Sequence, residues 1–537
     1  MQIPPGTIFI LIGCGVVLLI LWNLYHYSNA LSKRAFQRIA LLIIAAGMTA
    51  AFYFVLREHR RFASGRAKLL IFPFIQNAGE EQRSLSAEGF ALAEGVAARL
   101  ASNPQEQLQI LPAETIFELA NRDSLHDPAY LLKLGNGLGV DFLGLGAYQV
   151  VAGNYQIQFQ LFQSEQSQPL FQHSLKAPAH QPALAVGEIN EKILTQLDLP
   201  NTDDTSASFP ASRLAAAERL QYYGSYLDLV SGEPQQAARK AAALALSDTS
   251  QALFAVLSAR ATMHDLAQRR THEQEWRDSL RVLLPRLRSA MQRDSLSAAG
   301  WLTLGQAYIY AKKWNDAEQA LRRALARDSL NSKIYLSLAQ LHMSRVQDLG
   351  YKDELELCRR ALALNPFDVE AAIATANHLL LSNRREEAIA LLEKYRRLNP
   401  DHLPVLMMLG RIFVTKNEIL QTLPLFERIL ALDPANADAY YNLGIAYYNQ
   451  ENDSTAIRFF KRALQLNDHA DARLYLAYIY ERRKDMDRAI QYLRERIRLS
   501  TGDDDVFAGE ARKHLYDVLL QRGEIPENLL PDKLEKK

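Results

Sequence analysis

The chain has few of the residues on which small secreted or metal-binding proteins depend. Its 537 residues include two cysteines, Cys14 and Cys358, and four tryptophans, and its formal net charge is +1. Two cysteines exclude a disulfide framework, although they do not identify the compartment. A net charge near zero argues against a protein that binds nucleic acid by electrostatic attraction. The basic cluster from Arg57 to Arg66 follows an apolar run, where anionic lipid head groups are its simplest partner.

Motifs of common catalytic and nucleotide-binding sites are also missing. We find no G-x-x-x-x-G-K-[ST] loop, no G-x-S-x-G turn and no H-E-x-x-H helix. Closely spaced glycines occur from Gly135 to Gly139, but this run follows a predicted helix and opens a strand, the reverse of a phosphate-binding turn. We interpret it as a helix stop. His342, His378 and His402 lack metal-ligand spacing, so no metal, cofactor or enzymatic reaction is expected.

Long hydrophobic runs are confined to the amino-terminal region. Thr7 to Tyr25 is almost wholly apolar, and Ile39 to Leu56 has 18 residues without a charge, each near the length of about 20 residues that a membrane-spanning helix needs. Met1 to Gly6 contains no basic residue, which favours a retained anchor over a cleaved signal peptide. Residues 1–67 are therefore predicted to form a membrane anchor with two helices.

Basic residues flank the two runs unequally. Lys33, Arg34 and Arg38 lie between them, whereas five basic residues follow the second run: Arg57, Arg60, Arg61, Arg66 and Lys68. Because positive charge is enriched on the cytoplasmic side, this count predicts an inner-membrane protein whose large soluble part is cytoplasmic.

Residues 68–199 contain both short strand-like apolar runs and segments with helical spacing. This mixture predicts a small α/β domain. Short apolar runs indicate strands at Leu69–Phe74, Leu108–Leu111, Val140–Val151, Tyr155–Phe162 and Leu170–Leu175. Helical spacing indicates helices at Leu85–Ala101, Ala113–Asn121, Pro128–Leu138 and Ala183–Leu197. The strand from Tyr155 alternates apolar and polar residues, as in an antiparallel strand with one buried face.

This domain resembles the TolB amino-terminal-like domain of bacterial envelope proteins. The resemblance is carried by Leu70-Ile71-Phe72-Pro73-Phe74, Ala87-Glu88-Gly89-Phe90, the run Leu138 to Gly146 and the strand Gln156 to Leu161. The family usually has an acidic residue and a pair of small residues where this chain has Gly144-Leu145-Gly146. Any partner contact made by that acidic residue is therefore not expected here.

A second architecture begins after a polar segment, Pro200 to Pro210, which has the composition of a flexible linker and predicts that the parts on either side can reorient. Beyond it, a small residue recurs in steps of 34, 37, 34, 34 and 33 residues, at Gly305, Ala339, Ala376, Gly410, Gly444 and Ala477. Asn-Pro or Asp-Pro closes several of these units. The 37-residue step coincides with Val346 to Lys352, where we expect a lengthened turn.

The recurring unit resembles a tetratricopeptide repeat. Its clearest copy combines Trp301, Leu304, Gly305 and Tyr308 with Ala317, Leu321 and Ala324. Weaker copies begin near Leu220 and near Leu253, the latter with a longer turn at Gln268–Gln274. Residues 211–503 are therefore predicted to form about eight stacked helix pairs, and 504–537 a capping helix at Asp505–Arg522 with a polar tail. The fold class is mainly α, a solenoid preceded by a small α/β domain and a membrane hairpin.

The resemblance also implies where a partner binds. In tetratricopeptide arrays the first helix of each pair lines a concave groove, with inward residues one and five positions after the Trp301 position. Amides, an arginine and tyrosines at or near such positions suit an extended peptide. The alternative is that they are ordinary solvated surface residues. The candidates are Gln306, Gln340, Asn377, Arg411, Tyr441, Tyr448 and Tyr478.

These observations lead to three functional hypotheses. The first is a non-enzymatic, membrane-anchored adaptor of bacteria that binds protein or peptide partners through the solenoid. The second is a sensory or regulatory subunit that acts through a separate effector, since the chain contains no effector domain of its own. The third is an enzyme within 68–199, for which the sequence offers no acid-base pair or nucleophile. A homo-oligomer is left open.

Overall fold

The computed structural model describes residues 66–524, apart from 78–82, 103–107, 121–123, 126, 165, 167, 200–213, 215, 249–250, 270–272, 468 and 501–504. The predicted membrane helices at 7–25 and 39–56, the linker 200–210 and residues 525–537 lie outside the described residues. Within the described part, none of the helices is both long and apolar enough to cross a membrane. The chain forms two compact units: unit 1 extends to Ala311 without Glu118–Asn121, and unit 2 comprises Glu118–Asn121 and Lys312 onward.

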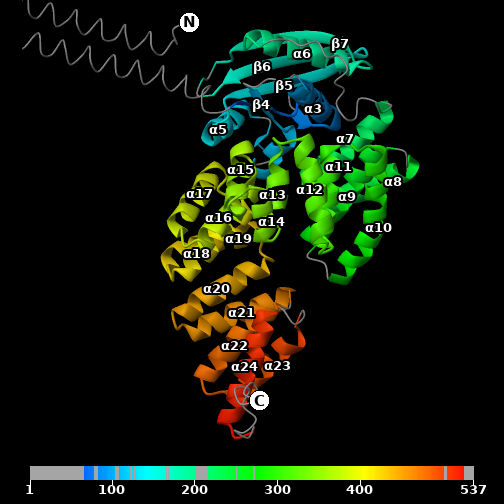
Figure 1. Cartoon of the computed structure of the whole chain (residues 1–537). Helices are drawn as coiled ribbons and strands as arrows, with labels where there is room; N and C mark the ends of the chain where they lie inside the picture. The colour runs from blue at the N-terminus through cyan, green and yellow to red at the C-terminus, as the bar shows by residue number, and fades with distance from the viewer. Residues whose placement is uncertain are drawn as a thin grey trace, which may run out of the picture. The chain divides into compact units, whose positions relative to one another are not determined.

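Unit 1 begins with a seven-stranded mixed sheet and its helices (Figure 1). The strands are β1 (Ala67–Ile71), β2 (Ile75–Asn77), β3 (Arg83–Leu85), β4 (Leu108–Leu111), β5 (Phe142–Val151), β6 (Asn154–Gln163) and β7 (Phe171–Pro178). The helical elements are α3 (Ala87–Ser102), a 3₁₀ turn η1 (Ala113–Thr115), α4 (Ile116–Leu119), α5 (Pro128–Leu138) and α6 (Pro182–Gln196). The predicted α/β region is thus confirmed as a mixed α/β fold.

The sheet joins a parallel part to an antiparallel part through β5. Strand β1 pairs in parallel with both β4 and β5, whereas β5, β6 and β7 form an antiparallel meander. In β6 the residues Tyr155, Ile157, Phe159 and Leu161 are buried, and the glutamines between them are more exposed. This alternation follows from the two-residue period of a strand with one covered face.

Several sequence-based boundaries are corrected by the structure. The strand expected over Leu69–Phe74 ends at Ile71, because Pro73 has no backbone N–H to donate to a ladder. The helix expected from Ala113 is a 3₁₀ turn followed by the four-residue α4. The interpretation of the glycine run as a helix stop is confirmed: Gly139 ends α5 with φ of +74°, and its N–H donates to the carbonyl of Asn136 at 3.2 Å.

Five further helices complete unit 1 and pack in sequence order. They are α7 (Ala216–Val230), α8 (Pro234–Ser247), α9 (Ala252–Gln268), α10 (Glu273–Arg293) and α11 (Ala298–Tyr310). The break between α9 and α10 lies where the sequence predicts a longer turn. Helix α3 of the α/β domain packs against α7, and this contact opposes the free reorientation that the linker composition predicts.

Unit 2 consists of helix pairs that follow one another along the chain, and each helix packs against its neighbours in sequence. They are α12 (Trp314–Arg327), α13 (Ser332–Leu338), α14 (Met343–Asp348), α15 (Glu354–Leu364), α16 (Val369–Leu381), α17 (Arg385–Leu398), α18 (Leu403–Thr415), α19 (Ile419–Leu432), α20 (Ala437–Asn449), α21 (Asp453–Asn467), α22 (Ala470–Arg482), α23 (Met486–Arg498) and α24 (Val506–Gln521). The predicted mainly α solenoid is confirmed.

The small residues of the repeat allow the two helices of a pair to approach. A Cβ at Gly410 would lie 2.7 Å from the ring of Phe426, and one at Gly444 would lie 2.5 Å from the ring of Phe460. The short turn within each of the four pairs from α16 to α23 contains a left-handed residue at the same period, with φ between +57° and +61° at Asn383, Asn417, Glu451 and Lys484. Close packing and turn geometry therefore repeat together.

The longer 37-residue step is a broken first helix. Helix α13 ends early at Leu338, and the added residues form the short α14 and a turn in which Gly350 has φ of +87°. The lengthened turn expected at Val346–Lys352 is therefore partly helical, since Val346 to Asp348 belong to α14.

The last helix, α24, agrees with the predicted capping helix. Asp505 caps its amino terminus by accepting from the N–H of Ala508 at 2.9 Å. Both carboxylate oxygens of Asp505 also accept from the buried Arg496, at 2.6 and 3.1 Å, and Asp471 is a further partner of this guanidinium at 2.9 Å. This buried charge network fixes α24 on the preceding pair.

Candidate functional site

The seven residues selected from the sequence fall in both units. Gln306 is half-buried on α11 of unit 1, whereas the other six belong to unit 2. Asn377 on α16 and Arg411 on α18 are exposed, and Gln340 is exposed in the turn that follows α13 rather than on a helix. In unit 2 the first helices α16, α18, α20 and α22 contact one another in succession, so their side chains form one continuous surface.

The tyrosines of this surface form a single aromatic cluster. Tyr441 and Tyr448 lie on α20, and Tyr478 lies on α22. Tyr475, which sequence reasoning missed, joins all three: its ring centroid lies 5.9 Å from Tyr441, 5.4 Å from Tyr448 and 6.2 Å from Tyr478. The signal was available, because Tyr475 and Tyr478 are three residues apart and share a helix face.

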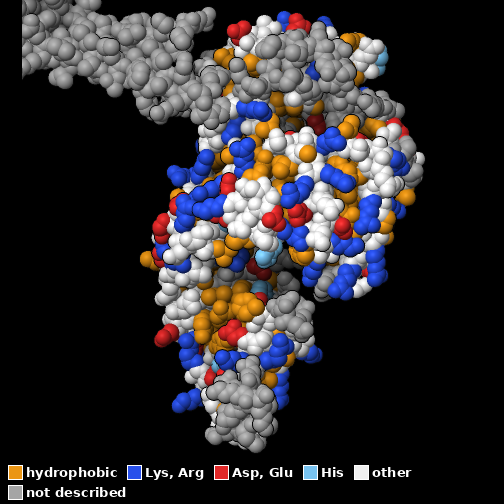
Figure 2. Space-filling view, viewed as in Figure 1, with side chains coloured by type: hydrophobic (Ala, Val, Ile, Leu, Met, Phe, Trp, Pro, Cys, Tyr) orange, Lys and Arg blue, Asp and Glu red, His pale blue; other side chains and the backbone are white. Residues whose placement is uncertain are grey.

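Each tyrosine of the cluster keeps part of its ring accessible. All four are half-buried, and in Figure 2 hydrophobic side chains gather at the level of α20 in unit 2. Tyr441 is stacked on the ring of His469 at 4.2 Å. The Tyr478 hydroxyl donates to Glu510 of α24 at 2.6 Å. Burial, reinforced by this carboxylate, raises the pKa of Tyr478, so the phenol stays protonated and acts as a donor.

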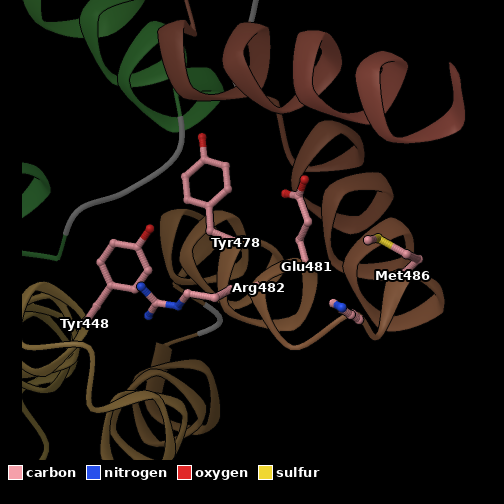
Figure 3. Close-up of a pocket in the computed structure, with 6 residues that line it drawn as sticks. Tyr448, Tyr478, Glu481, Arg482 and Met486 are labelled. Atoms are coloured by element: carbon pink, nitrogen blue, oxygen red, sulfur yellow. The ribbon is translucent and has the colours of Figure 1, made fainter. Parts of the chain in front are cut away.

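A pocket of about 560 Å³ opens beside two of the predicted tyrosines. It is lined by Tyr448, Tyr478, Glu481, Arg482, Lys484 and Met486. Figure 3 shows the Arg482 guanidinium turned toward Tyr448, Glu481 directed toward a neighbouring helix, and Met486 at the other end of the pocket. Rings and a thioether supply apolar surface, and the charged groups lie among them.

Most charges in the pocket wall are already paired. Arg482 binds Asp453 and lies over the ring of Tyr448, 4.8 Å from its centroid. Glu481 is bound by His514 of α24. Among the charged residues that line the pocket, Lys484 alone has no side-chain hydrogen bond or ion pair, and it is exposed. The pocket can therefore offer rings for apolar contact and one ammonium group for hydrogen bonding.

A second polar cluster lies within unit 1 and was missed by sequence reasoning. It gathers Glu94 of α3, Glu114 of η1, Arg260 of α9 and the tyrosines of α7. Burial, with a further contribution from Glu114, raises the pKa of Glu94 from 4.5 to about 7. No sequence motif identifies this cluster, because its members come from four separate elements and two of them, Glu94 and Arg260, are 166 residues apart.

The described residues show no set of three or more histidine, cysteine, aspartate or glutamate side chains arranged to hold a metal ion. Cys358, on α15, is buried, and burial raises the pKa of its thiol to about 12. A thiol in this environment stays protonated at neutral pH and is a poor nucleophile.

Models of one family match the repeats of this chain. A tetratricopeptide repeat model covers residues 437–469, and a second tetratricopeptide repeat model covers 302–347, 355–402 and 456–504. The matched residues include the helices that carry the tyrosine cluster and the pocket.

One curated relative shares part of this region. Protein O-mannosyl-transferase TMTC3 from Homo sapiens is 34% identical over 96 residues, which are 17% of this chain and 10% of that protein. This chain thus spans about a tenth of the length of the curated relative that it matches.

Solved structures that are similar to this chain have low sequence identity to it. YrrB, described as a TPR protein with an unusual peptide-binding site, is 18% identical, with 37% of this chain and 97% of that chain covered and a TM-score of 0.28. The type IV pilus biogenesis factor PilW is 19% identical, with 41% and 98% covered and a TM-score of 0.34. Yeast Tom70 is 14% identical, with 66% and 78% covered and a TM-score of 0.40. From the matched family models and the repeated helix pairs, the chain is a tetratricopeptide repeat protein.

Proposed function

We propose that this chain is a non-enzymatic adaptor that is anchored in a bacterial inner membrane and binds an extended protein segment along the first helices of unit 2. Tetratricopeptide repeat proteins mediate protein and peptide binding. The observation that carries the proposal is the half-exposed tyrosine cluster of α20 and α22 beside the pocket at Tyr448 and Tyr478. Tyrosines suit such a role because they add contact area with little loss of side-chain entropy.

The anchoring part of this proposal comes from the sequence. The two apolar runs at 7–25 and 39–56 have the length of membrane spans, and the basic residues that follow them favour a cytoplasmic soluble part. The α/β domain, with its resemblance to TolB amino-terminal-like domains, would dock a partner or a neighbouring copy. A single cysteine at Ser206, in a chain lacking Cys14 and Cys358, tests the orientation. Labelling by an impermeant maleimide only after lysis supports it, and labelling after permeabilising the outer membrane alone contradicts it.

The binding surface can be tested by photo-crosslinking in cells. A benzoylphenylalanine placed at Asn377, Arg411 or Tyr448 should form an adduct with one and the same partner, because these residues lie on successive first helices. The matched control positions are Leu420 on α19 and Lys461 on α21, which are exposed on second helices. Equal adducts from the control positions, or none from the three test positions, would contradict the proposal.

The identity of the crosslinked protein separates the adaptor from the regulatory alternative. An envelope-assembly protein supports the adaptor, whereas a kinase or cyclase without its own sensor domain supports a regulatory subunit.

A further inference from the structure

An aromatic contact joins the α/β domain to the first helix of the repeats within unit 1. Phe90 of α3 lies against Tyr223 and Tyr226 of α7, with ring centroids 6.2 and 5.5 Å apart. All three side chains are buried, and Tyr222 and Phe254 extend the same apolar layer. We call this contact the α3–α7 junction. Its rings exclude water from any polar group placed among them.

Glu94 enters this junction one helical turn after Phe90. Its Oε2 atom is buried and has no hydrogen-bond partner, while the carboxyl group is hydrogen-bonded to Tyr223. The charged and titratable groups that face it or its bonded tyrosine come from three elements: Glu114 of η1, Arg219, Tyr222 and Tyr223 of α7, and Arg260 of α9. A carboxylate here is poorly solvated, so the neutral acid is favoured in the packed state.

The nearby Arg260 compensates a negative charge on Glu94 only in part. Arg260 lies 3.4 Å from Oε2 of Glu114, which also accepts from the Tyr226 hydroxyl, and it covers the Tyr226 ring at 5.2 Å from the centroid. Arg260 therefore pairs with Glu114 rather than with Glu94, and the Glu114 carboxyl group disfavours a negative charge on Glu94. Two carboxyl groups that share one cation favour protonation of the less well paired member.

We propose that the α3–α7 junction is a pH-sensitive contact, in which ionisation of Glu94 weakens the packing of the α/β domain on the first helix pair. A group that binds its proton more tightly when packed loses stabilisation as pH rises. The loss begins near pH 4.5, the ordinary pKa of a glutamate carboxyl, and is complete above about 7, the pKa of Glu94 in the packed state. Across this range the junction equilibrium should shift toward separation by about two orders of magnitude.

Spin-label distance measurements on the full-length chain in detergent test this proposal. Labels are attached at Gln172→Cys on β7 and Gln236→Cys on α8, both exposed, after replacing Cys14 by Ser and Cys358 by Ala. The distance distribution should be narrow at pH 5 and broaden by pH 8.5. In Glu94→Gln, which cannot ionise, it should stay narrow at both pH values.

The matched control is Glu88→Gln, on the same helix but bound to Tyr155 of the sheet, which should retain the pH dependence of the unmodified chain. Glu114→Gln removes the neighbouring negative charge, so the pKa of Glu94 in the packed state should fall toward its ordinary value and the broadening between pH 5 and pH 8.5 should become smaller. This variant provides a second test if Glu94→Gln does not fold. A distribution that is the same at both pH values in the unmodified chain would overturn the proposal. So would a pH dependence that persists in Glu94→Gln.

Discussion

Both units carry tyrosines at helical spacing, but the tyrosines are buried in unit 1 and partly exposed in unit 2. In unit 1, α7 carries three tyrosines that are buried between α3 and α9, each at most 7% exposed: Tyr222, Tyr223 and Tyr226. In unit 2, Tyr475 and Tyr478 of α22 have the same three-residue spacing, but their rings are half-exposed beside a pocket. The first set holds two elements together, whereas the second set leaves ring surface accessible, and we propose that a partner binds there. Spacing places tyrosines on one face of a helix, and the neighbouring element decides whether that face is covered.

Truncating one ring in each set should give the largest difference between them. Tyr223→Ala should lower the free energy of unfolding by about 3–5 kcal/mol, because it opens a cavity in a closed core. Tyr448→Ala should lower it by about 1 kcal/mol, because the half-exposed ring leaves little empty volume. Denaturant unfolding monitored by circular dichroism measures both. Equal losses would show that the second tyrosine set is structural as well.

The pH dependence of stability should also separate the units. Glu94→Gln should raise the free energy of unfolding of unit 1 at pH 8 by about 1–3 kcal/mol, since it removes the ionised form of a poorly satisfied buried group. At pH 4.5, where the native carboxyl is neutral, the gain should disappear. Unfolding followed by hydrogen exchange in α3 and α7, compared with α20 and α22, reports each unit separately. A gain in unit 2 instead would contradict this assignment.

Affinity for the partner should depend on the tyrosines of unit 2 and not on those of unit 1. Tyr478→Ala should weaken capture of the crosslinked partner by roughly 10-fold, the loss expected for an aromatic contact residue that supplies about 1–2 kcal/mol. Tyr223→Phe, which keeps the buried ring, should leave that affinity unchanged. Fluorescence anisotropy with the partner segment identified by crosslinking provides the measurement. An affinity that depends on Tyr223 but not on Tyr478 would place the binding surface elsewhere.

The smallest expected effect concerns a single hydroxyl. Tyr478→Phe removes the hydrogen bond to Glu510 but keeps the ring, so stability should change by about 0.5–1 kcal/mol or less. Thermal unfolding of Tyr478→Phe beside Tyr440→Phe, a tyrosine for which the structure describes stacking and no hydroxyl bond, isolates the contribution of that bond. A larger loss would mean that Glu510 fixes α24 through Tyr478.

Sequence reasoning succeeded where a residue's role depends on near neighbours in the chain. The repeat period, the helix stop at Gly139 and the capping helix at Asp505 each rest on contacts within a few residues or on a regular step. The break between α13 and α14 was only partly anticipated. A 37-residue step shows that residues were added, but the helix assignment of Val346 to Asp348 depends on what they pack against.

The candidate site divides in the same way. Tyr478 was selected from its repeat position and Tyr448 as a residue near that series, and both line the pocket. Gln306 falls in the other unit, and Gln340 leaves the helix because α13 ends early. Tyr475 was missed because its role depends on ring contacts with tyrosines of its own and a neighbouring helix. Lys484 was missed because only the structure shows that it lines the pocket without an ion pair to any described residue.

The sequence by itself determined the architecture: a repeat of about 34 residues, a preceding α/β region and the residues that make each helix pair close-packed. It could do so because these features follow from periodicity and from local turn chemistry. Only the tertiary structure decided which aromatic face is covered and which is open, and it alone brought Glu94 and Glu114 together beside one arginine. Burial and charge pairing depend on residues distant in the chain, so no local pattern records them.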